Sequence, residues 1–157
     1  GSYNDPKLEK AILNAVAKGI LVVVASGNEN NPNYDEYEYS YPALYNECIT
    51  VAACDEFHKL APFSNNHLQV DVTAAGVNVL STYPVNKYAK LSGTSMATPH
   101  VAGMLALLIN LGEKKFKREL EEAEIYGLLT KVCCSLGYEA STEGHGLPEL
   151  TRFFEEC

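Results

Sequence analysis

The sequence predicts an α/β fold in which helices cover a parallel β-sheet, and two segments carry this prediction. Residues 20–28 read Ile-Leu-Val-Val-Val-Ala-Ser-Gly-Asn, an apolar run that is typical of a buried parallel strand and passes into a small polar turn. Residues 93–103 read Gly-Thr-Ser-Met-Ala-Thr-Pro-His-Val-Ala-Gly and open a long apolar helical run. Strands that alternate with helices favour a parallel sheet.

Local signals define the elements around these two segments. Asp5 and Pro6 predict the start of a helix, and Gly19 predicts its end, directly before the apolar strand. Further strands are predicted from short apolar or alternating runs bounded by turn residues, over residues 48–53, 69–73, 79–83 and 88–91.

Three helical segments are predicted in the second half of the chain. The first runs from Ser95 to Leu111, the second covers residues 119–132, and a turn with a terminal helix covers residues 144–154. Because the Ser95 helix is apolar on nearly all sides, we expect other elements to enclose it.

Composition predicts one globular domain. The chain has 157 residues, of which 46% are hydrophobic, and we expect no apolar stretch long enough to cross a membrane. The 12 basic and 20 acidic residues give a net charge of −8, which disfavours nucleic acid and anionic membranes as partners. Five cysteines without a C-x-x-C pair favour a reducing compartment over a disulfide framework.

Ser95 is the candidate nucleophile. The first N–H groups of a helix lack intrahelical partners and its dipole is positive there, so an oxyanion that forms beside Ser95 would be stabilised. Asn28 ends the apolar strand, where ligands bind in open α/β sheets. The alternatives are that Thr94 or Ser95 only caps the helix and that Gly-Asn is an ordinary turn.

No histidine of the chain is predicted to act as the base for Ser95. His100 follows Ser95 by five positions, about 140° around a helix, and therefore points away from the hydroxyl. The other three histidines, at positions 58, 67 and 145, lie in turn-like or glycine-rich surroundings without an obvious carboxylate to orient them.

Residues 93–103 closely resemble the catalytic serine motif of the subtilisin-like serine proteases, the subtilases. This resemblance implies a subtilisin-like three-layer fold and endopeptidase activity with Ser95 as nucleophile. It also implies that the Asn28 amide and the Ser95 N–H hold the oxyanion. The cysteine usage, the Ser-Thr-Tyr-Pro run at residues 81–84 and the charged insert at residues 113–122 look most like the intracellular subtilisins of Gram-positive bacteria, which implies a cytoplasmic protein.

The subtilases carry their catalytic residues in the order Asp, His, Ser, and no Asp-Thr-Gly or His-Gly-Thr-His motif precedes Asn28. We therefore expect residues 3–157 to be the C-terminal portion of a subtilase catalytic domain, with a cloning scar at residues 1–2. The isolated chain is expected to be inactive, with a peptide or protein as substrate and the missing N-terminal part as a partner. The alternatives are a non-catalytic binding or regulatory module and self-association through exposed apolar surface.

The resemblance also implies substrate-binding residues, which are Ala25, Ser26, Gly27, Glu29, Ser40, Ala43, Leu91 and Thr94. The first three match a strand edge that pairs with the substrate backbone. Ser40 and Ala43 match a wall of the pocket for the residue before the scissile bond, Glu29 lies near its rim, and the Tyr41–Pro42 bond is cis in the family.

A weak cation site is implied in the same way. The carbonyl oxygens of Ala43, Tyr45 and Cys48 and the Asp71 carboxylate match a site of some subtilases, and oxygen ligands suit Ca²⁺ or Na⁺. Asp71 as an ordinary surface carboxylate is the alternative. No organic cofactor is expected, because the glycine-containing turns lack the lysine and the spacing of a phosphate-binding loop.

Overall fold

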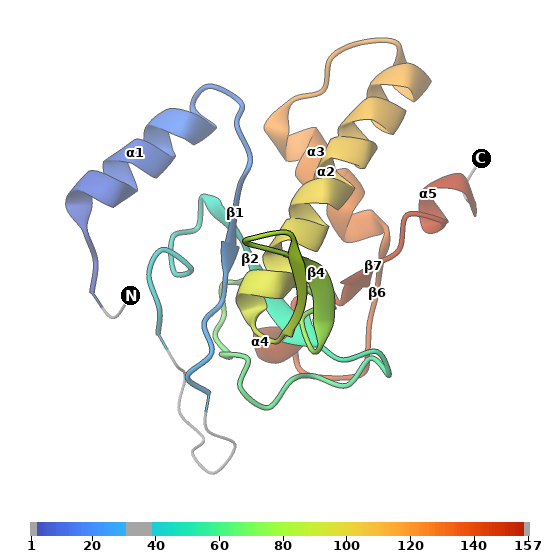
Figure 1. The fold of residues 1–157 in the computed structure, drawn as a ribbon. Coiled ribbons are helices and arrows are strands. Elements are labelled where there is room, and N and C mark those ends of the chain that lie inside the picture. The colour runs from blue at the N-terminus through green and yellow to red at the C-terminus, as the bar shows by residue number, and fades with distance from the viewer. Residues whose placement is uncertain (1–2, 31–38, 156–157) are drawn as a thin grey trace.

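Three parallel strands form the centre of the computed structural model, which describes residues 3–30 and 39–155 (Figure 1). The strands are β1 (Val22–Ala25), β2 (Cys48–Cys54) and β3 (Val70–Ala75), in the order β1-β2-β3. This sheet confirms the predicted α/β class. The predicted scar at residues 1–2 lies outside the described residues.

Helices cover both faces of the sheet. On one face, α1 (Pro6–Val16) packs through Ile12 beside Tyr45 and Cys48. On the other face, α2 (Thr94–Phe116) packs against all three strands, and α3 (Glu122–Lys131) packs against α2 (Figure 1). The alternating residues of β1 separate the two layers, since Val22 and Val24 contact the α1 cluster whereas Val23 contacts the α2 cluster. The result is a three-layer arrangement.

The local signals at the ends of α1 are confirmed. The Asp5 carboxylate accepts a hydrogen bond from the Lys7 N–H at 2.9 Å, which caps the helix. Gly19 takes a φ of 75°, a left-handed conformation that suits glycine, and the chain then turns into β1.

Short elements complete the fold. β4 (Val79–Tyr83) and β5 (Lys87–Leu91) form an antiparallel hairpin, and β6 (Cys133–Cys134) pairs with β7 (Leu147–Pro148). Two four-residue helices follow, α4 (Ala140–Glu143) and α5 (Arg152–Glu155). β6, β7 and α4 were not predicted, because elements of two to four residues are too short to show a hydrophobic period.

The prediction that other elements enclose α2 is wrong for the described residues. Leu105 and Leu108 are buried against the sheet, but Leu107, on the opposite face of the helix, is 52% exposed. Similarly, the predicted buried strand is only half-buried, because β1 lies at the edge of the sheet and pairs with β2 alone among the described strands. An apolar helix or strand sequence predicts that its surface is buried, but it does not predict which segment buries it.

The expectation that no apolar stretch is long enough to cross a membrane also needs correction. By length and composition alone, α2 passes that test, the one helix of the described residues to do so. A long core helix of a water-soluble domain has the same composition. Here α2 packs along one side against the sheet and α3.

The hairpin between β4 and β5 contains a strained residue. Val85 and Asn86 at its tip have φ values of 63° and 55°, and a β-branched side chain is strongly disfavoured in this region, whereas asparagine tolerates it. Replacing the exposed Val85 with asparagine is expected to raise the free energy of unfolding by about 1 kcal/mol. Urea denaturation measures this gain. Val85→Ala removes the β-branch but lacks the polar side chain that lets asparagine tolerate this φ, so it should gain less; equal stability of all three proteins would contradict the strain.

Candidate active site

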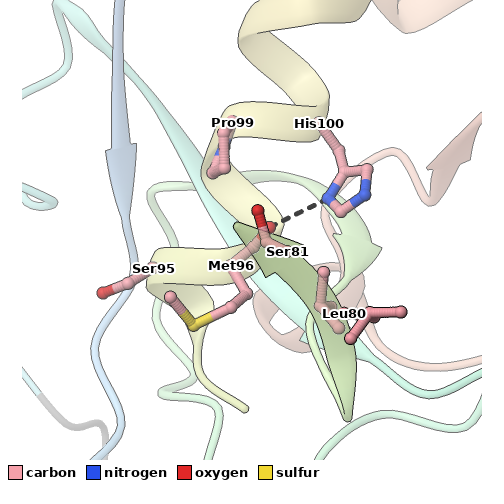
Figure 2. Close-up of a pocket in the computed structure, with 7 residues that line it drawn as sticks. Leu80, Ser81, Ser95, Met96, Pro99 and His100 are labelled. Atoms are coloured by element: carbon pink, nitrogen blue, oxygen red, sulfur yellow. Dashed lines mark hydrogen bonds between the residues drawn. The ribbon is translucent and has the colours of Figure 1, made fainter. Parts of the chain in front are cut away.

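Ser95 lies in the first turn of α2 with its side chain exposed to solvent. Figure 2 shows the hydroxyl pointing toward β1, away from His100 on the other side of the helix. A hollow of about 340 Å³ lies between β4 and the start of α2, and both Ser95 and Met96 line it. Because the Ser95 side chain is exposed, its hydroxyl is accessible to a bound chain.

Asn28 is fixed beside Ser95 through the neighbouring Thr94. The Asn28 Oδ1 accepts a hydrogen bond from the Thr94 N–H at 2.8 Å, and the Thr94 hydroxyl lies 3.1 Å from the same oxygen. Because the Thr94 N–H is a donor, the Asn28 amide atom that it contacts must be the oxygen and not the nitrogen. The Asn28 NH₂ group is the opposite end, and no hydrogen bond joins it to the residues that the structure describes. The start of α2 therefore holds Asn28, which follows β1, so that its NH₂ group is available as a hydrogen-bond donor beside Ser95.

The turn before Ser95 depends on Gly93. This residue precedes α2 with a φ of 154°, and a Cβ there would lie 3.6–3.7 Å from the two polar atoms of the Asn28 amide. The first N–H groups of a helix have no intrahelical acceptor. Thr94 uses its N–H to hold Asn28, which leaves the Ser95 N–H as a second donor at the same helix start.

None of the histidines reaches Ser95 within the described part of the chain. His100 Nδ1 lies 2.9 Å from the Met96 carbonyl oxygen, which fixes its ring along the helix (Figure 2). His145 packs edge-on against Tyr126, and His58 lies exposed in the turn after β2. His67 is fully buried. Ser95 thus has no general base from these four side chains.

Burial of His67 predicts a loss of stability in acid. Its side chain is 0% exposed, and burial lowers its pKa below the ordinary value. As the pH falls below about 6.5, the unfolded chain binds a proton that the folded chain refuses, so the free energy of unfolding decreases toward the folded-state pKa. His67→Gln should flatten this pH dependence in urea titrations between pH 7.5 and 5. Exposed His58→Gln is the control, and an unchanged slope in His67→Gln would contradict the assignment.

The arrangement of a serine at a helix start and an amide donor at a strand end can be compared with known proteins. A sequence model of the subtilase family matches residues 1–146. The chain belongs to the subtilase family. Curated relatives agree: it is 43% identical over 151 residues to the "Major intracellular serine protease" of Bacillus subtilis (strain 168), covering 96% of this chain and 47% of that protein.

Two other relatives of this subtilase show the same pattern. The "Intracellular serine protease" of Paenibacillus polymyxa is 44% identical over 161 residues, covering 99% of this chain and 49% of that protein. "Subtilisin BL" of Lederbergia lenta is 41% identical over 140 residues, covering 89% and 48%. The predicted likeness to intracellular subtilisins is confirmed. The chain spans about half the length of the curated relatives it matches.

The substrate-binding residues predicted for a subtilase lie in several places. Ser26 extends the β1 ladder, since its N–H donates to the Val51 carbonyl at 3.0 Å, and the other edge of β1 is unpaired within the described strands. Glu29 and Leu91 are exposed, and Ser40 is half-buried. Ala43 is 1% exposed, directly after the Tyr41–Pro42 cis bond. Their roles stay predictions.

Asp71, predicted as a cation ligand, lies within a hydrogen-bond network. Its carboxylate accepts hydrogen bonds from the Thr50 N–H and the Tyr126 hydroxyl, both at 2.7 Å. Burial raises the pKa of this carboxyl, and these two donors oppose the rise. Asp71 also lines a hollow of about 140 Å³ with Tyr45 and Cys48. Asp71 is therefore a hydrogen-bonded carboxylate beside a hollow, and its role as a cation ligand stays a prediction.

Asn65 was not predicted as a site residue, but it lies beside the predicted site. Its side chain is 1% exposed and bonds to Glu29, 36 positions away. Only the Ser-Asn-Asn run at residues 64–66 was available as a signal, and such a run is typical of any polar turn.

Proposed function

We propose that this chain forms the nucleophile-bearing half of a serine endopeptidase that acts on peptides or proteins. The Ser95 Oγ attacks a peptide carbonyl carbon while its proton passes to a base, and the carbonyl oxygen becomes an oxyanion. The Ser95 N–H and the Asn28 Nδ2 donate to that oxygen. Collapse of the intermediate breaks the C–N bond and releases the amine, and water then hydrolyses the ester on Ser95. The anchoring of Asn28 Oδ1 on the Thr94 N–H is the observation that carries this proposal.

The base is proposed to come from residues outside this chain. The positions of the four histidines support this view, as does the match to only about half of each relative. In this proposal, the rest of the same catalytic domain is the partner of the chain, and residues 3–157 alone do not hydrolyse peptides. An unactivated serine hydroxyl is a weak nucleophile at neutral pH.

Labelling with a fluorophosphonate tests both statements, because useful rates require a serine that a base activates. The intact mass is measured for this chain, for a longer protein of the relatives' length that contains it, and for Ser95→Ala in the longer protein. We expect one adduct, on the longer protein only. An adduct on the chain alone would overturn the external base. A folded longer protein without an adduct would overturn the peptidase and support a non-catalytic binding or regulatory module.

The exposed face of α2 is proposed to be covered by that other part of the domain. Leu107 on α2 and Leu80 on the hairpin are 52% and 63% exposed in this chain. Exposed apolar surface of this kind promotes association. The isolated chain is therefore proposed to self-associate, which sedimentation over a range of concentrations tests; a monomer at every concentration would contradict it.

A weak Ca²⁺ or Na⁺ site is proposed at Ala43, Tyr45, Cys48 and Asp71. The carbonyl oxygens of Ala43 and Tyr45 already accept hydrogen bonds from the Thr50 hydroxyl and the Cys48 N–H, and a carbonyl oxygen keeps a second lone pair. The hollow beside Asp71 supports this proposal. Added Ca²⁺ or Na⁺ should raise the melting temperature, and Asp71→Asn should abolish that rise.

A cytoplasmic location is proposed from two observations. The two relatives with nearly complete coverage of this chain are named intracellular serine proteases. Moreover, the four cysteines in the described residues all carry free thiols, three of them buried. Fractionation of cells that express the protein tests the proposal.

A further inference from the structure

The turn that carries Asn28 is held by a side chain from a distant loop. Asn65 Oδ1 accepts a hydrogen bond from the Glu29 N–H at 2.7 Å, and Asn65 Nδ2 donates to Glu29 Oε2 at 2.8 Å. The Asn65 N–H also donates to the Gly27 carbonyl at 3.1 Å. One buried residue therefore binds the turn on both sides of Asn28.

The Glu29 carboxylate is fixed at a second point. Its Oε2 accepts a hydrogen bond from the Asn28 N–H at 2.8 Å, so one oxygen joins the Asn28 backbone to the Asn65 side chain. The fit is close, because a Cβ on Gly27 would lie 2.2 Å from Asn65 Nδ2 and 2.5 Å from Glu29 Oε2. The φ of 114° at Gly27 excludes other residues as well.

We propose that Asn65 is a positioning residue of the active site, which holds the Glu29 carboxylate and the Asn28 amide in one rigid turn. This inference rests on the proposed peptidase function. Asn65 touches neither Ser95 nor the reacting atoms in this scheme; it acts through Asn28 and Glu29. Without Asn65, the exposed Glu29 side chain loses one of the two donors that hold its carboxylate and regains rotamer freedom.

A fixed carboxylate next to the oxyanion donor has a consequence for substrate choice. Glu29 is exposed and one residue from Asn28, so its charge lies at the edge of the site where a peptide binds. A cationic side chain of the peptide near this carboxylate is attracted, and in a largely solvated site one such pair changes kcat/KM by about 3- to 10-fold. Loss of Asn65 should reduce this preference because the carboxylate then samples other positions.

Hydrogen exchange on this chain tests the positioning directly, without any need for activity. Asn65→Leu has a similar size and removes both side-chain bonds to Glu29. Asn65→Ser, which introduces no large apolar group into the turn, is the second variant if Asn65→Leu fails to fold. NMR exchange rates of the Asn28 and Glu29 backbone N–H groups should rise at least about tenfold in either folded variant. Unchanged rates in a folded variant would overturn the proposal.

Asn30→Ala provides a matched control. Asn30 Nδ2 donates to the Pro62 carbonyl at 3.3 Å, so it bridges the same two segments without touching the Glu29 carboxylate. Its removal should leave the exchange of the Asn28 and Glu29 N–H groups near that of the unmodified chain. Equal acceleration in Asn30→Ala and Asn65→Leu would show general loosening of the loop and overturn the specific role of Asn65.

Turnover by the longer protein provides the second measurement. A peptide series carries lysine or methionine at one position at a time, and the ratio of kcat/KM for lysine over methionine is compared among variants. Glu29→Gln and Asn65→Leu should lower this ratio about 3- to 10-fold at the same peptide position, whereas Asn30→Ala should not. A lowered ratio in Glu29→Gln but not in Asn65→Leu would overturn the positioning role. Absence of any turnover would overturn the peptidase function instead, and the exchange rates would still decide the role of Asn65.

Discussion

Replacing Asn28 with leucine is expected to lower the kcat of the proposed peptidase by about 10²- to 10³-fold, with little change in KM. This magnitude is taken from subtilisin, a member of the same family, in which removal of the oxyanion asparagine has this effect. The physical reason is that the amide donor acts on a charge that exists only after attack by Ser95. An interaction made only in the transition state affects kcat.

Asn28→Asp is the sharper companion variant. The aspartate keeps an oxygen for the Thr94 N–H, so the turn retains its anchor, but it places a second oxygen where the amide donor was. A negative charge facing the forming oxyanion should reduce kcat at least as much as leucine does. If either folded variant kept its full kcat in steady-state kinetics on the longer protein, Asn28 would not be an oxyanion donor.

Local chemistry explains which parts of the fold the sequence predicted. The Asp5 cap, the apolar run before Asn28 and the start of α2 at Thr94 depend on residues close in sequence, and the structure confirms the corresponding elements. Predicted strand and helix ends are shifted by a few residues from the observed ones. The ends of β2 and α3 depend on which groups their backbone N–H and C=O groups bond to. Sequence propensity does not give these partners, so the predicted ends are slightly shifted.

Long-range contacts explain what the sequence did not predict. The bonds between Asn65 and Glu29 join residues 36 positions apart, and nothing in either polar turn signals the other. The same limit applies to His67, whose glycine-free turn gave no sign that the ring would be fully buried. The bond between Asn28 and the Thr94 N–H spans 66 positions and was not predicted; the family resemblance implied only that Asn28 acts together with the Ser95 N–H.

The exposed face of α2 leads to the second large effect. Leu108 is 0% exposed in the core between the sheet and α3, so Leu108→Ala is expected to lower the free energy of unfolding of this chain by about 2–5 kcal/mol through lost contacts and a cavity. Its neighbour Leu107 is 52% exposed, and Leu107→Ala should change stability by no more than about 0.5 kcal/mol. Urea denaturation of the two variants, at a concentration where the chain is monomeric, measures the difference.

The same two variants, Leu107→Ala and Leu108→Ala, show whether the exposed face of α2 stays in water or is covered by another part of the domain. In a longer protein whose other half covers α2, Leu107 becomes a buried side chain, and its truncation should then cost about 2 kcal/mol or more, close to the cost at Leu108. Small effects of Leu107→Ala in both the chain and the longer protein would show that this face of α2 stays in contact with water. That result would remove the apolar surface as the physical reason for self-association of the isolated chain.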